Sequence, residues 1–403
     1  MGNLPIRSVA LSATLIAYVA HRCLTSRPRG VNGHRGPQAR RSPAIVTVTG
    51  PSDPARGVDV VALGESMVTF RPSAPGRLAE VPSFHRGIGG AESNTACMLA
   101  RAGHTARWIS RVGADPFGDH LLAAIAGHGV DVSRVRRDPD RPTGIYFRTA
   151  GDRATDAHEV AYYRAGSAAS AMTPANVPAD AALDGRVLHL SGITAALSEG
   201  CRDLLGELTA PRPDRPLISF DVNHRAGLWQ HPEDPRILLD LARRADIVFV
   251  GEDEAEEAWG ITGGAEAIRK ALPEPETLVV KRGAHGARAF HGDAPARGTS
   301  GPSQVTSAPA LAVDVVATVG AGDAFAAGFL SATLRGLPVR QRLRHGHLWA
   351  AAALTAPGDL APPPPAALAD RLAALDDTEW GRLRLGPGWT AAVERADEEV
   401  RTP

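Results

Sequence analysis

A glycine turn that ends in an aspartate is the feature of the sequence with the clearest chemical meaning. The turn consists of Gly320, Ala321, Gly322 and Asp323, and it lies between an apolar run and an amphipathic helical segment. Glycines let the backbone approach a phosphate closely, and the free N–H groups at a helix start bind anions. An aspartate at that place can accept a proton from an attacking hydroxyl. The turn therefore predicts phosphoryl transfer, with residues 320–322 as an anion hole and Asp323 as the base.

Two other glycine motifs that bind phosphate are excluded by the residues present. A Walker A loop needs the dipeptide GK, which occurs nowhere in the chain. A dinucleotide fingerprint GxGxxG would need a glycine at position 325, where Phe325 stands. A purely structural helix cap remains an alternative, although such a cap does not require an aspartate directly after the glycines.

The elements that must position this turn follow a repeating order along the chain. The apolar residues 310–319 predict a strand that leads into the turn. From Val58 onward, short apolar strands alternate with longer amphipathic helices. This alternation is typical of an α/β fold with a mostly parallel central sheet and helices on both faces. The expected strands lie at 58–66, 105–113, 187–192, 216–223, 245–252 and 277–283.

Two segments, 67–86 and 143–166, break this alternation. Polar and aromatic residues alternate in the second of them around a charged turn, which indicates strands outside the main sheet. A small β lid over the carboxyl ends of a parallel sheet would lie where open α/β sheets bind ligands. An ordinary antiparallel excursion is the alternative interpretation.

Composition restricts the class of protein. The chain has 403 residues, 43% of them hydrophobic, and a formal net charge of zero, so it can bury a large core and has no global basic field for nucleic acid or an anionic membrane. The three cysteines, Cys23, Cys97 and Cys201, show no CxxC spacing, which argues against a zinc site or a disulfide framework. A reducing compartment, the cytoplasm, fits best.

The N-terminal part of the chain is expected to lie outside the fold. The apolar run 9–20 is too short to span a membrane, and residues 25–56 are rich in Pro, Gly, Arg and Ser without periodicity. We therefore interpret residues 1–56 as a disordered extension or as the product of a wrongly assigned start. The catalytic domain is expected over 57–375, followed by a C-terminal tail over 376–403.

With these motifs in place, the sequence resembles the ribokinase-like (PfkB) carbohydrate kinases. That family carries a GAGD turn followed by a phenylalanine as its second signature, and the glycine pair Gly89 and Gly90 with Asn94 resembles its first. The resemblance covers residues 58 to about 375. It implies a ribokinase-like α/β/α sandwich with a β lid and an ATP-dependent sugar kinase activity.

Within the family, several stretches are similar to the 2-keto-3-deoxygluconate kinases. These stretches are GESMVTFRP (64–72), AYYRAGSAAS (161–170), HLSGIT (189–194) and DVNHRAGLW (221–229). A sugar acid suits guanidinium groups, which offer paired donors to a carboxylate. The resemblance implies a sugar-acid pocket lined by Gly90, Tyr146, Tyr162, Arg164, Ile193 and Arg225. Surface arginines on solvated strands are the alternative for Arg164 and Arg225.

The resemblance also implies a nucleotide site and a magnesium ion. Lys281 and Gly283 match the family segment near the ATP phosphates, together with Gly320 and Gly322. The adenine is expected near the helices at 348–359. In place of the family motif NxxE the chain has Gly251 with Glu254, so Glu254 is the expected magnesium-site acid. The acidic run 252–257 could also simply begin a helix.

One further position departs from the family. Relatives usually carry an aspartate three residues before GAGD, at a monovalent-cation site, and Ala317 stands there. Either the aspartate is lost, or residues 317–319 are an insertion that displaces Asp314. The resemblance therefore leaves open whether this chain requires a monovalent cation.

Three functions follow as alternatives. The first is ATP-dependent conversion of 2-keto-3-deoxygluconate to its 6-phosphate. The second is a kinase for a neutral sugar such as fructose or ribose, against which the arginines argue because a cation pair without a carboxylate is unfavourable. The third is a sugar-acid sensor of the same fold without turnover. The expected partners are a small sugar acid and ATP, with no nucleic acid and no membrane, and a homo-oligomer is expected from the family's lid strands.

Overall fold

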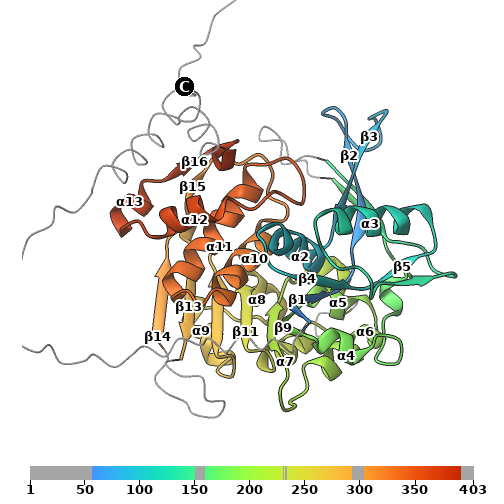
Figure 1. The fold of residues 1–403 in the computed structure, drawn as a ribbon, viewed down its shortest axis with the longest axis horizontal. Coiled ribbons are helices and arrows are strands. Elements are labelled where there is room, and N and C mark those ends of the chain that lie inside the picture. Colours follow the sequence, from blue (N-terminus) through green and yellow to red (C-terminus); the bar gives the residue numbers. More distant parts are fainter. Residues whose placement is uncertain (1–56, 150–158, 230, 232–233, 293–303, 392–403) are drawn as a thin grey trace, which may run out of the picture.

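The computed structural model describes residues 57–149, 159–229, 231, 234–292 and 304–391 (Figure 1). The expected N-terminal extension 1–56, with its apolar run, lies outside the described residues. Within the described ranges, no helix has both the length and the apolar character needed to cross a bilayer.

An eight-stranded sheet forms the centre of the fold, in the order β14-β13-β12-β11-β10-β9-β1-β4. Six strands run parallel, and the last two, β13 and β14, are antiparallel additions at one edge. The predicted parallel core is thus present. The strands are β1 (Val58–Leu63), β4 (Ala106–Ile109), β9 (Gly185–Ser191), β10 (Leu217–Asp221), β11 (Ile247–Gly251), β12 (Thr277–Lys281), β13 (Ala287–His291) and β14 (Gln304–Ala308).

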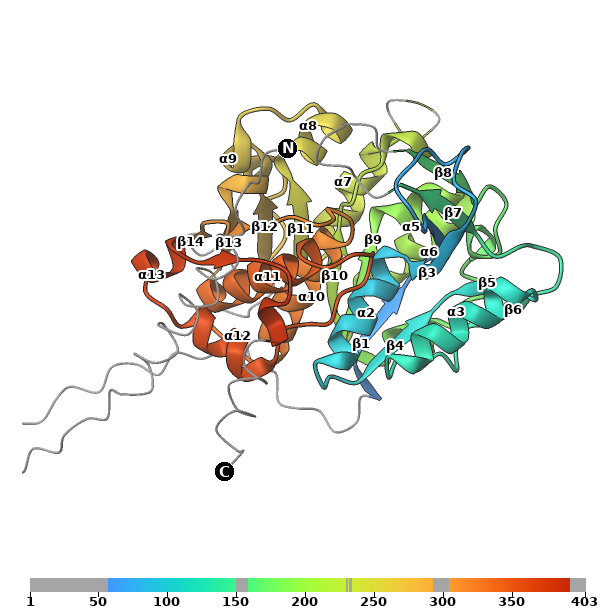
Figure 2. The same ribbon diagram turned by 90° about the horizontal axis from the view of Figure 1, so that it is seen from above.

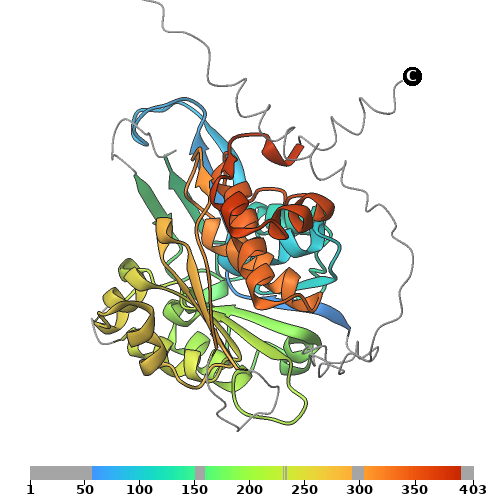
Figure 3. The same ribbon diagram turned by 90° about the vertical axis from the view of Figure 1, so that its left-hand side faces the viewer.

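Alternation along each strand divides the core between the two faces of the sheet. Val60 packs into the cluster on one face and Val61 into the cluster on the other, because successive side chains of a strand point in opposite directions. The first face is covered by α2 (Ala91–Arg101), α10 (Ala321–Leu334), α11 (Val339–Leu354) and α12 (Ala366–Ala373). The second is covered by α4 (Ala179–Leu183), α5 (Gly192–Leu197), α6 (Glu199–Leu208), α7 (Arg236–Arg243), α8 (Glu252–Trp259) and α9 (Gly264–Ala271). Figure 3 shows these two helical layers on either side of the sheet.

A smaller four-stranded sheet, in the order β3-β2-β7-β8, projects beyond the main sheet (Figures 1 and 3). Its strands are β2 (Met67–Pro72), β3 (Phe84–Gly89), β7 (Ile145–Arg148) and β8 (Val160–Tyr163). They come from the two segments that broke the strand–helix alternation in the sequence. The remaining pair, β5 (Arg111–Gly113) and β6 (Arg136–Asp138), accompanies α3 (Pro116–Gly127) at the edge next to α2 (Figure 2).

The strand expected over 310–319 is largely absent, which corrects the sequence interpretation. Only β15 (Ala312–Val313) is a strand, and it pairs with β16 (Arg384–Leu385) rather than with the main sheet. The chain then approaches the glycine turn without regular structure. Its N–H groups are satisfied by a helix end instead of a ladder, because Val316 and Ala317 both donate to the carbonyl of Leu354 at the end of α11.

The described structure also continues past residue 375, where the sequence analysis ended the domain. After α12, the chain forms α13 (Asp377–Gly381), β16 and a short 3-10 turn at Trp389–Ala391. Trp380 and Trp389 are buried in the core cluster beneath α11 and α12. Residues 377–391 are therefore packed against the domain rather than forming a free tail.

Candidate active site

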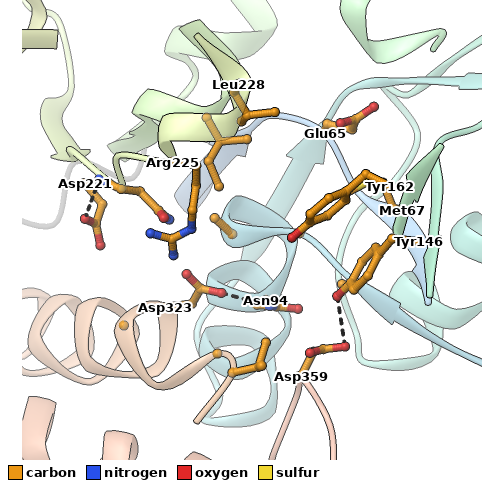
Figure 4. Close-up of a pocket in the computed structure, with 18 of the residues that line it drawn as sticks. Glu65, Met67, Asn94, Tyr146, Tyr162, Asp221, Arg225, Leu228, Asp323 and Asp359 are labelled. Carbon is orange, nitrogen blue, oxygen red and sulfur yellow. Dashed lines mark hydrogen bonds between the residues drawn. The ribbon is translucent and has the colours of Figure 1, made fainter. Parts of the chain in front are cut away.

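A cavity of about 580 Å³, called the main cavity below, opens at the carboxyl edge of the parallel strands. Residues from the ends of five strands line it: Glu65 after β1, Ile193 after β9, Asp221 at the end of β10, Glu254 after β11 and Lys281 at the end of β12. The lid contributes Met67, Tyr146 and Tyr162, and the start of α10 contributes Gly320, Gly322 and Asp323 (Figure 4). This is the place where open parallel sheets bind ligands.

The glycine turn begins α10, and its backbone needs glycine. Gly320 is the N-cap residue and has a φ of 78°, in the left-handed region. A Cβ atom added there would lie 2.2 Å from the carbonyl oxygen of Asp359. No side chain of the described residues caps the helix, so the first N–H groups of α10 are available to an anion. The predicted helix start and the predicted anion hole thus coincide in position.

Asp323 is held by a side chain from the opposite helix. The Asn94 Nδ2 atom, in α2, donates a hydrogen bond of 2.9 Å to the Asp323 Oδ2 atom (Figure 4). Thr95 places its hydroxyl 3.4 Å from the main-chain oxygen of Asp323. The carboxylate is therefore fixed at the first turn of α10, on the wall of the main cavity.

The surroundings shift the proton affinity of this carboxylate. Removal from bulk water raises the pKa of Asp323 to about 7, and the negative charges of Asp221 and Glu92 act in the same direction. The hydrogen bond from Asn94 and the positive charge of Arg225 oppose the rise. A base with a pKa near the working pH can both accept and release a proton efficiently.

A lysine lies on the other side of the turn, between two carboxylates. The Lys281 Nζ atom is 3.0 Å from Asp221 Oδ1 and 3.6 Å from Glu254 Oε2. Burial alone would lower its pKa, but the two carboxylates keep the pKa of Lys281 above its ordinary value, so it stays charged. A fixed cation beside the first N–H groups of α10 extends the anion site.

A second, smaller cavity of about 230 Å³ adjoins the turn. It shares Lys281 and Gly322 with the main cavity, so the two cavities meet at the glycine turn. Gly283 and Ala321 line it together with apolar residues of α11, among them Ala350 and Leu354. The cavity thus reaches the helix at 348–359 where the adenine was expected, and the adenine site itself stays a prediction.

The far side of the main cavity is formed by the lid. The Tyr146 hydroxyl donates to Asp359 Oδ2 at 3.1 Å, and Arg148 forms an ion pair with Asp359 Oδ1 at 2.9 Å. Arg164 forms an ion pair with the buried Glu65 and lies over the ring of Tyr162. The charge of Arg164 is therefore already partly neutralised within the protein.

The two arginines do not lie on the same side of the cavity. In Figure 4 the guanidinium of Arg225 points toward Asp323, whereas Glu65, the partner of Arg164, lies across the cavity beside the lid tyrosines. The Arg225 side chain is 56% exposed, and its nearest carboxylate is Glu254 at 3.7 Å. The expected arginine pair is thus divided between the two ends of the pocket.

The site residues predicted from the sequence all line one of the two cavities. The main cavity is lined by Gly90, Tyr146, Tyr162, Arg164, Ile193, Arg225, Glu254, Lys281, Gly320, Gly322 and Asp323, and the smaller one by Gly283 and Ala321. Their individual roles remain predictions.

Four residues that line the main cavity have no role in the sequence-based prediction. Asn94 was part of a recognised motif but was given no role, and Asp221 and Asn223 lay within a quoted stretch. Asn223 has a φ of 40°, unusual for a residue other than glycine. Asp359 gave only a weak signal, a single acid between apolar segments, because its partners are distant in sequence.

The carboxylates at the cavity decide whether a magnesium ion fits there. Within the described ranges no three His, Cys, Asp or Glu side chains gather in a way that could hold a metal by themselves. Glu254 Oε2 accepts a hydrogen bond of 2.7 Å from the N–H of Gly251 at the start of α8, and Glu254 and Asp221 both face the main cavity. These residues fit an ion bound by one or two carboxylates, water and phosphate oxygens. The helix-start interpretation of residues 252–257 also holds, because α8 begins at Glu252.

Known proteins are similar to this chain over most of its length. Residues 58–366 match the pfkB family carbohydrate kinases. The 2-dehydro-3-deoxygluconokinase of Bacillus subtilis is 36% identical over 308 residues, 75% of this chain and 91% of the relative. Fructokinase-1 of Oryza sativa subsp. japonica is 33% identical over 276 residues, 67% of this chain and 81% of the relative.

A solved structure agrees with the architecture. The crystal structure of a PfkB protein from Polaromonas sp. JS666 is 35% identical, covers 74% of this chain and 96% of its own, and superimposes with a TM-score of 0.66. The family match covers most of the chain, and the ribokinase-like fold and the glycine turn at the head of α10 agree with it. The protein therefore belongs to the pfkB family of carbohydrate kinases and is a phosphotransferase.

Proposed function

We propose that the protein transfers the γ-phosphoryl group of ATP to a sugar acid, 2-keto-3-deoxygluconate, and forms its 6-phosphate. The observation that carries the proposal is the position of Asp323. Its carboxylate stands at the head of α10 on the wall of the main cavity, hydrogen-bonded to Asn94 and next to Gly322, which the two cavities share. A base at that junction can reach a hydroxyl in the larger cavity while a phosphate occupies the anion hole.

The reaction then follows from these positions. Asp323 accepts the proton of the 6-hydroxyl as its oxygen forms a bond to the γ-phosphorus, and the bond from that phosphorus to the ADP oxygen breaks. The N–H groups at residues 320–322 and the Lys281 ammonium stabilise the charge on the transferred group. ATP would extend into the smaller cavity along α11.

Magnesium would be held through water by Glu254 and Asp221, both of which face the main cavity. When bound, the ion neutralises phosphate charge and orients the phosphoryl group. Lys281 contacts both carboxylates in this structure, so one ammonium and two carboxylate groups lie together at the phosphate end of the pocket.

The two arginines would have different tasks. Arg225 points toward Asp323, so we assign it to the transferred phosphoryl group. Arg164 lies at the lid end with Tyr162, where the carboxylate of a six-carbon acid would lie if its 6-hydroxyl meets Asp323. The resemblance to sugar-acid kinases, including the Bacillus subtilis relative, supports this orientation.

A kinase for a neutral sugar is the second candidate, and one observation favours it. Glu65 pairs with Arg164 and removes much of the charge that a substrate carboxylate would meet. The rice fructokinase is also similar to this chain over two thirds of its length. The choice depends on how much of the Arg164 charge remains available to a ligand.

A coupled assay of ADP release separates the candidates. The substrates are 2-keto-3-deoxygluconate, 2-keto-3-deoxygalactonate, fructose and ribose, each with the wild-type chain, Arg164→Gln and Arg225→Gln. We expect the acids to have the higher kcat/KM, Arg164→Gln to raise the KM of the acids only, and Arg225→Gln to lower kcat for every substrate. A preference for fructose that Arg164→Gln leaves unchanged would establish the neutral-sugar alternative.

The same assay tests turnover itself. Asp323→Asn keeps the size and most hydrogen bonds of the side chain but removes the base, and we expect kcat to fall by about 10²–10⁴. ADP release that Asp323→Asn leaves unchanged would contradict the assignment of the base, and no turnover of any substrate by the wild-type chain would favour the sensor alternative.

A further inference from the structure

The C-terminal segment 376–391 lies beyond the part of the chain that matches the family, which ends at residue 366. It contains α13, β16 and the 3-10 turn at Trp389–Ala391. The family match therefore does not account for this segment, whereas its contacts with the rest of the chain indicate a task for it.

One set of contacts is a short parallel strand pair. β16 pairs with β15, with Ala312 opposite Arg384 and Val313 opposite Leu385 (Figure 1). The N–H group of Asp314, directly after β15, donates a hydrogen bond of 2.9 Å to the carbonyl of Leu385. Among the described strands β15 pairs only with β16, so its strand neighbour comes from the C-terminal segment alone.

Trp380 of α13 makes a second set of contacts. Its side chain is buried, and its indole Nε1 atom donates a hydrogen bond of 3.0 Å to the carbonyl of Pro309. The guanidinium of Arg344, on α11, lies 4.6 Å from the centroid of the Trp380 ring. A cation over an indole ring is a favourable contact, most of all where water is excluded. Trp380 therefore connects the residues before β15 to α11.

The two elements that Trp380 connects are walls of the smaller cavity beside the glycine turn. Together they contribute to its lining Ala310, Leu311, Val313, His347, Ala350, Ala351 and Leu354. No described residue of 376–391 lines this cavity. Any effect of the C-terminal segment on a ligand there must therefore pass through these walls.

The chemistry of the walls makes their position important. Apart from His347, the residues that the two elements contribute are apolar, so contact with a nucleobase would depend on burial and dispersion. Dispersion falls steeply with distance, and a gap of about 0.5–1 Å removes a quarter to a half of the attraction. A small outward shift of residues 309–313 would therefore weaken the binding of a nucleotide.

We propose that the C-terminal segment holds the wall of the nucleotide cavity at contact distance and that Trp380 is the positioning residue in this segment. The inference rests on the proposed placement of ATP in the smaller cavity. Trp380 acts on the nucleotide through Pro309 and α11 without touching it. Neither residues 309–313 nor α11 line the main cavity, so the sugar should bind independently of Trp380.

Calorimetric titration of the full chain with ADP, in the absence of sugar, tests the proposal. Trp380→Phe keeps an aromatic ring beside Arg344 and removes the N–H group that donates to Pro309. We expect the Kd of ADP to rise by about threefold to tenfold, the effect of about one hydrogen bond. Trp389→Phe is the matched control and should bind ADP like the wild type. Trp389 is buried in the same core cluster, and its indole N–H has no hydrogen-bond partner among the described residues.

Steady-state kinetics distinguish positioning from a general loss of stability. With the sugar that the wild-type chain phosphorylates fastest, Trp380→Phe should raise the KM of ATP by a similar factor and leave the KM of the sugar unchanged. A chain that is merely destabilised contains fewer active molecules, so its kcat would fall while both KM values stayed the same. That second pattern would show that Trp380 only supports the fold.

Ala350→Leu tests the placement of ATP independently of Trp380. Ala350 lines the smaller cavity from α11, so a larger side chain there should weaken ADP binding by about tenfold or more. Unchanged ADP binding by this variant would show that the nucleotide lies elsewhere, and it would refute both the placement and the inference that rests on it.

Two results would overturn the role of Trp380 and leave the placement of ATP intact. In the first, Ala350→Leu weakens ADP binding and Trp380→Phe does not. In the second, Trp380→Phe and Trp389→Phe weaken it equally, which would assign the loss to the core as a whole. Because ADP is titrated without sugar, these outcomes do not depend on which sugar the kinase phosphorylates.

Discussion

Asn94 and Asp323 are 229 residues apart in the sequence and are joined by a 2.9 Å hydrogen bond between Nδ2 and Oδ2. The bond connects α2 to the head of α10 and fixes the carboxylate that we assign as the base. An N–H donor stabilises the ionised form of a carboxylate, so Asn94 lowers the pKa of Asp323 while burial raises it. Asn94 therefore lowers the pH at which the proposed base becomes ionised.

Asn94→Ala should shift the pH dependence of the reaction. The base works in its ionised form, so kcat is expected to rise through the pKa of Asp323, about 7. Loss of the Asn94 donor raises that pKa, and the acid limb of the profile should move to higher pH. Profiles of kcat against pH for wild type and variant measure the shift. A variant that loses activity equally at every pH would show that Asn94 only supports the fold or the substrate.

Asp323 should also make the protein less stable as the pH rises. Its ordinary pKa is 3.8 and its folded pKa is about 7, so between these values the folded state holds a proton that the unfolded state has released. The stabilisation is complete below 3.8 and is lost as the pH rises through about 7.

Asp323→Asn removes this ionisation. The variant should melt at a higher temperature than wild type at pH 8, and the difference should shrink at acidic pH. Thermal unfolding followed by circular dichroism at several pH values measures both curves. A constant difference across the whole pH range would contradict the raised pKa.

Two glycines of the turn should respond differently to alanine. Gly320 has a φ of 78°, and its Cβ would meet the Asp359 carbonyl at 2.2 Å, so Gly320→Ala should destabilise the fold by more than the roughly 1–2 kcal/mol that the left-handed backbone alone costs. The nearest atom to a Cβ at Gly322 is Lys281 Nζ, at 3.9 Å. Gly322→Ala should therefore keep the wild-type stability.

Kinase activity should also distinguish the two alanine substitutions. Gly322 lines both cavities, so a methyl group there would occupy space at the phosphate site and should lower kcat/KM although the fold is intact. Denaturant unfolding combined with the ADP-release assay tests both substitutions. Full activity of Gly322→Ala would argue against a phosphate passing this residue.

The Glu65–Arg164 pair should be strongly coupled. The side chains are 1% and 10% exposed, so removing either charge leaves the other buried without its partner. Glu65→Gln is expected to destabilise the protein by about 3–5 kcal/mol. The double variant Glu65→Gln with Arg164→Gln should lose less than the sum of the single losses. Urea unfolding of the four proteins measures this cycle, and additive losses would indicate that the pair does not interact.

Several features of the protein could be read from the sequence because their causes are local. A short apolar run such as 245–252 is typical of a parallel strand that is buried on both faces, and the structure has the buried strand β11 there. The turn at 320–323 begins a helix because Gly320 accepts a backbone conformation that other residues avoid. The lid segments were recognised because they broke the alternation of strands and helices.

Other features were decided by the tertiary structure. Residues 310–319 are as apolar as a strand, yet only two of them pair, because the edge of the main sheet is occupied by β14 and the chain passes along the end of α11. The burial of Trp380 and Trp389 was also decided by tertiary packing. The C-terminal segment packs against helices that are distant from it in sequence, so the local sequence could not predict this contact.

The site itself depends most on long-range packing. The sequence identified Asp323, Arg164 and Tyr146 as separate residues, but their partners Asn94, Glu65 and Asp359 come from elements far along the chain. Local sequence fixes backbone preferences over a few residues, whereas hydrogen bonds and ion pairs across such separations exist only after the helical layers and the lid have packed on the sheet. The residue that we propose as the base could thus be identified from the sequence, whereas its pKa and the pairing of the arginines were set by the fold.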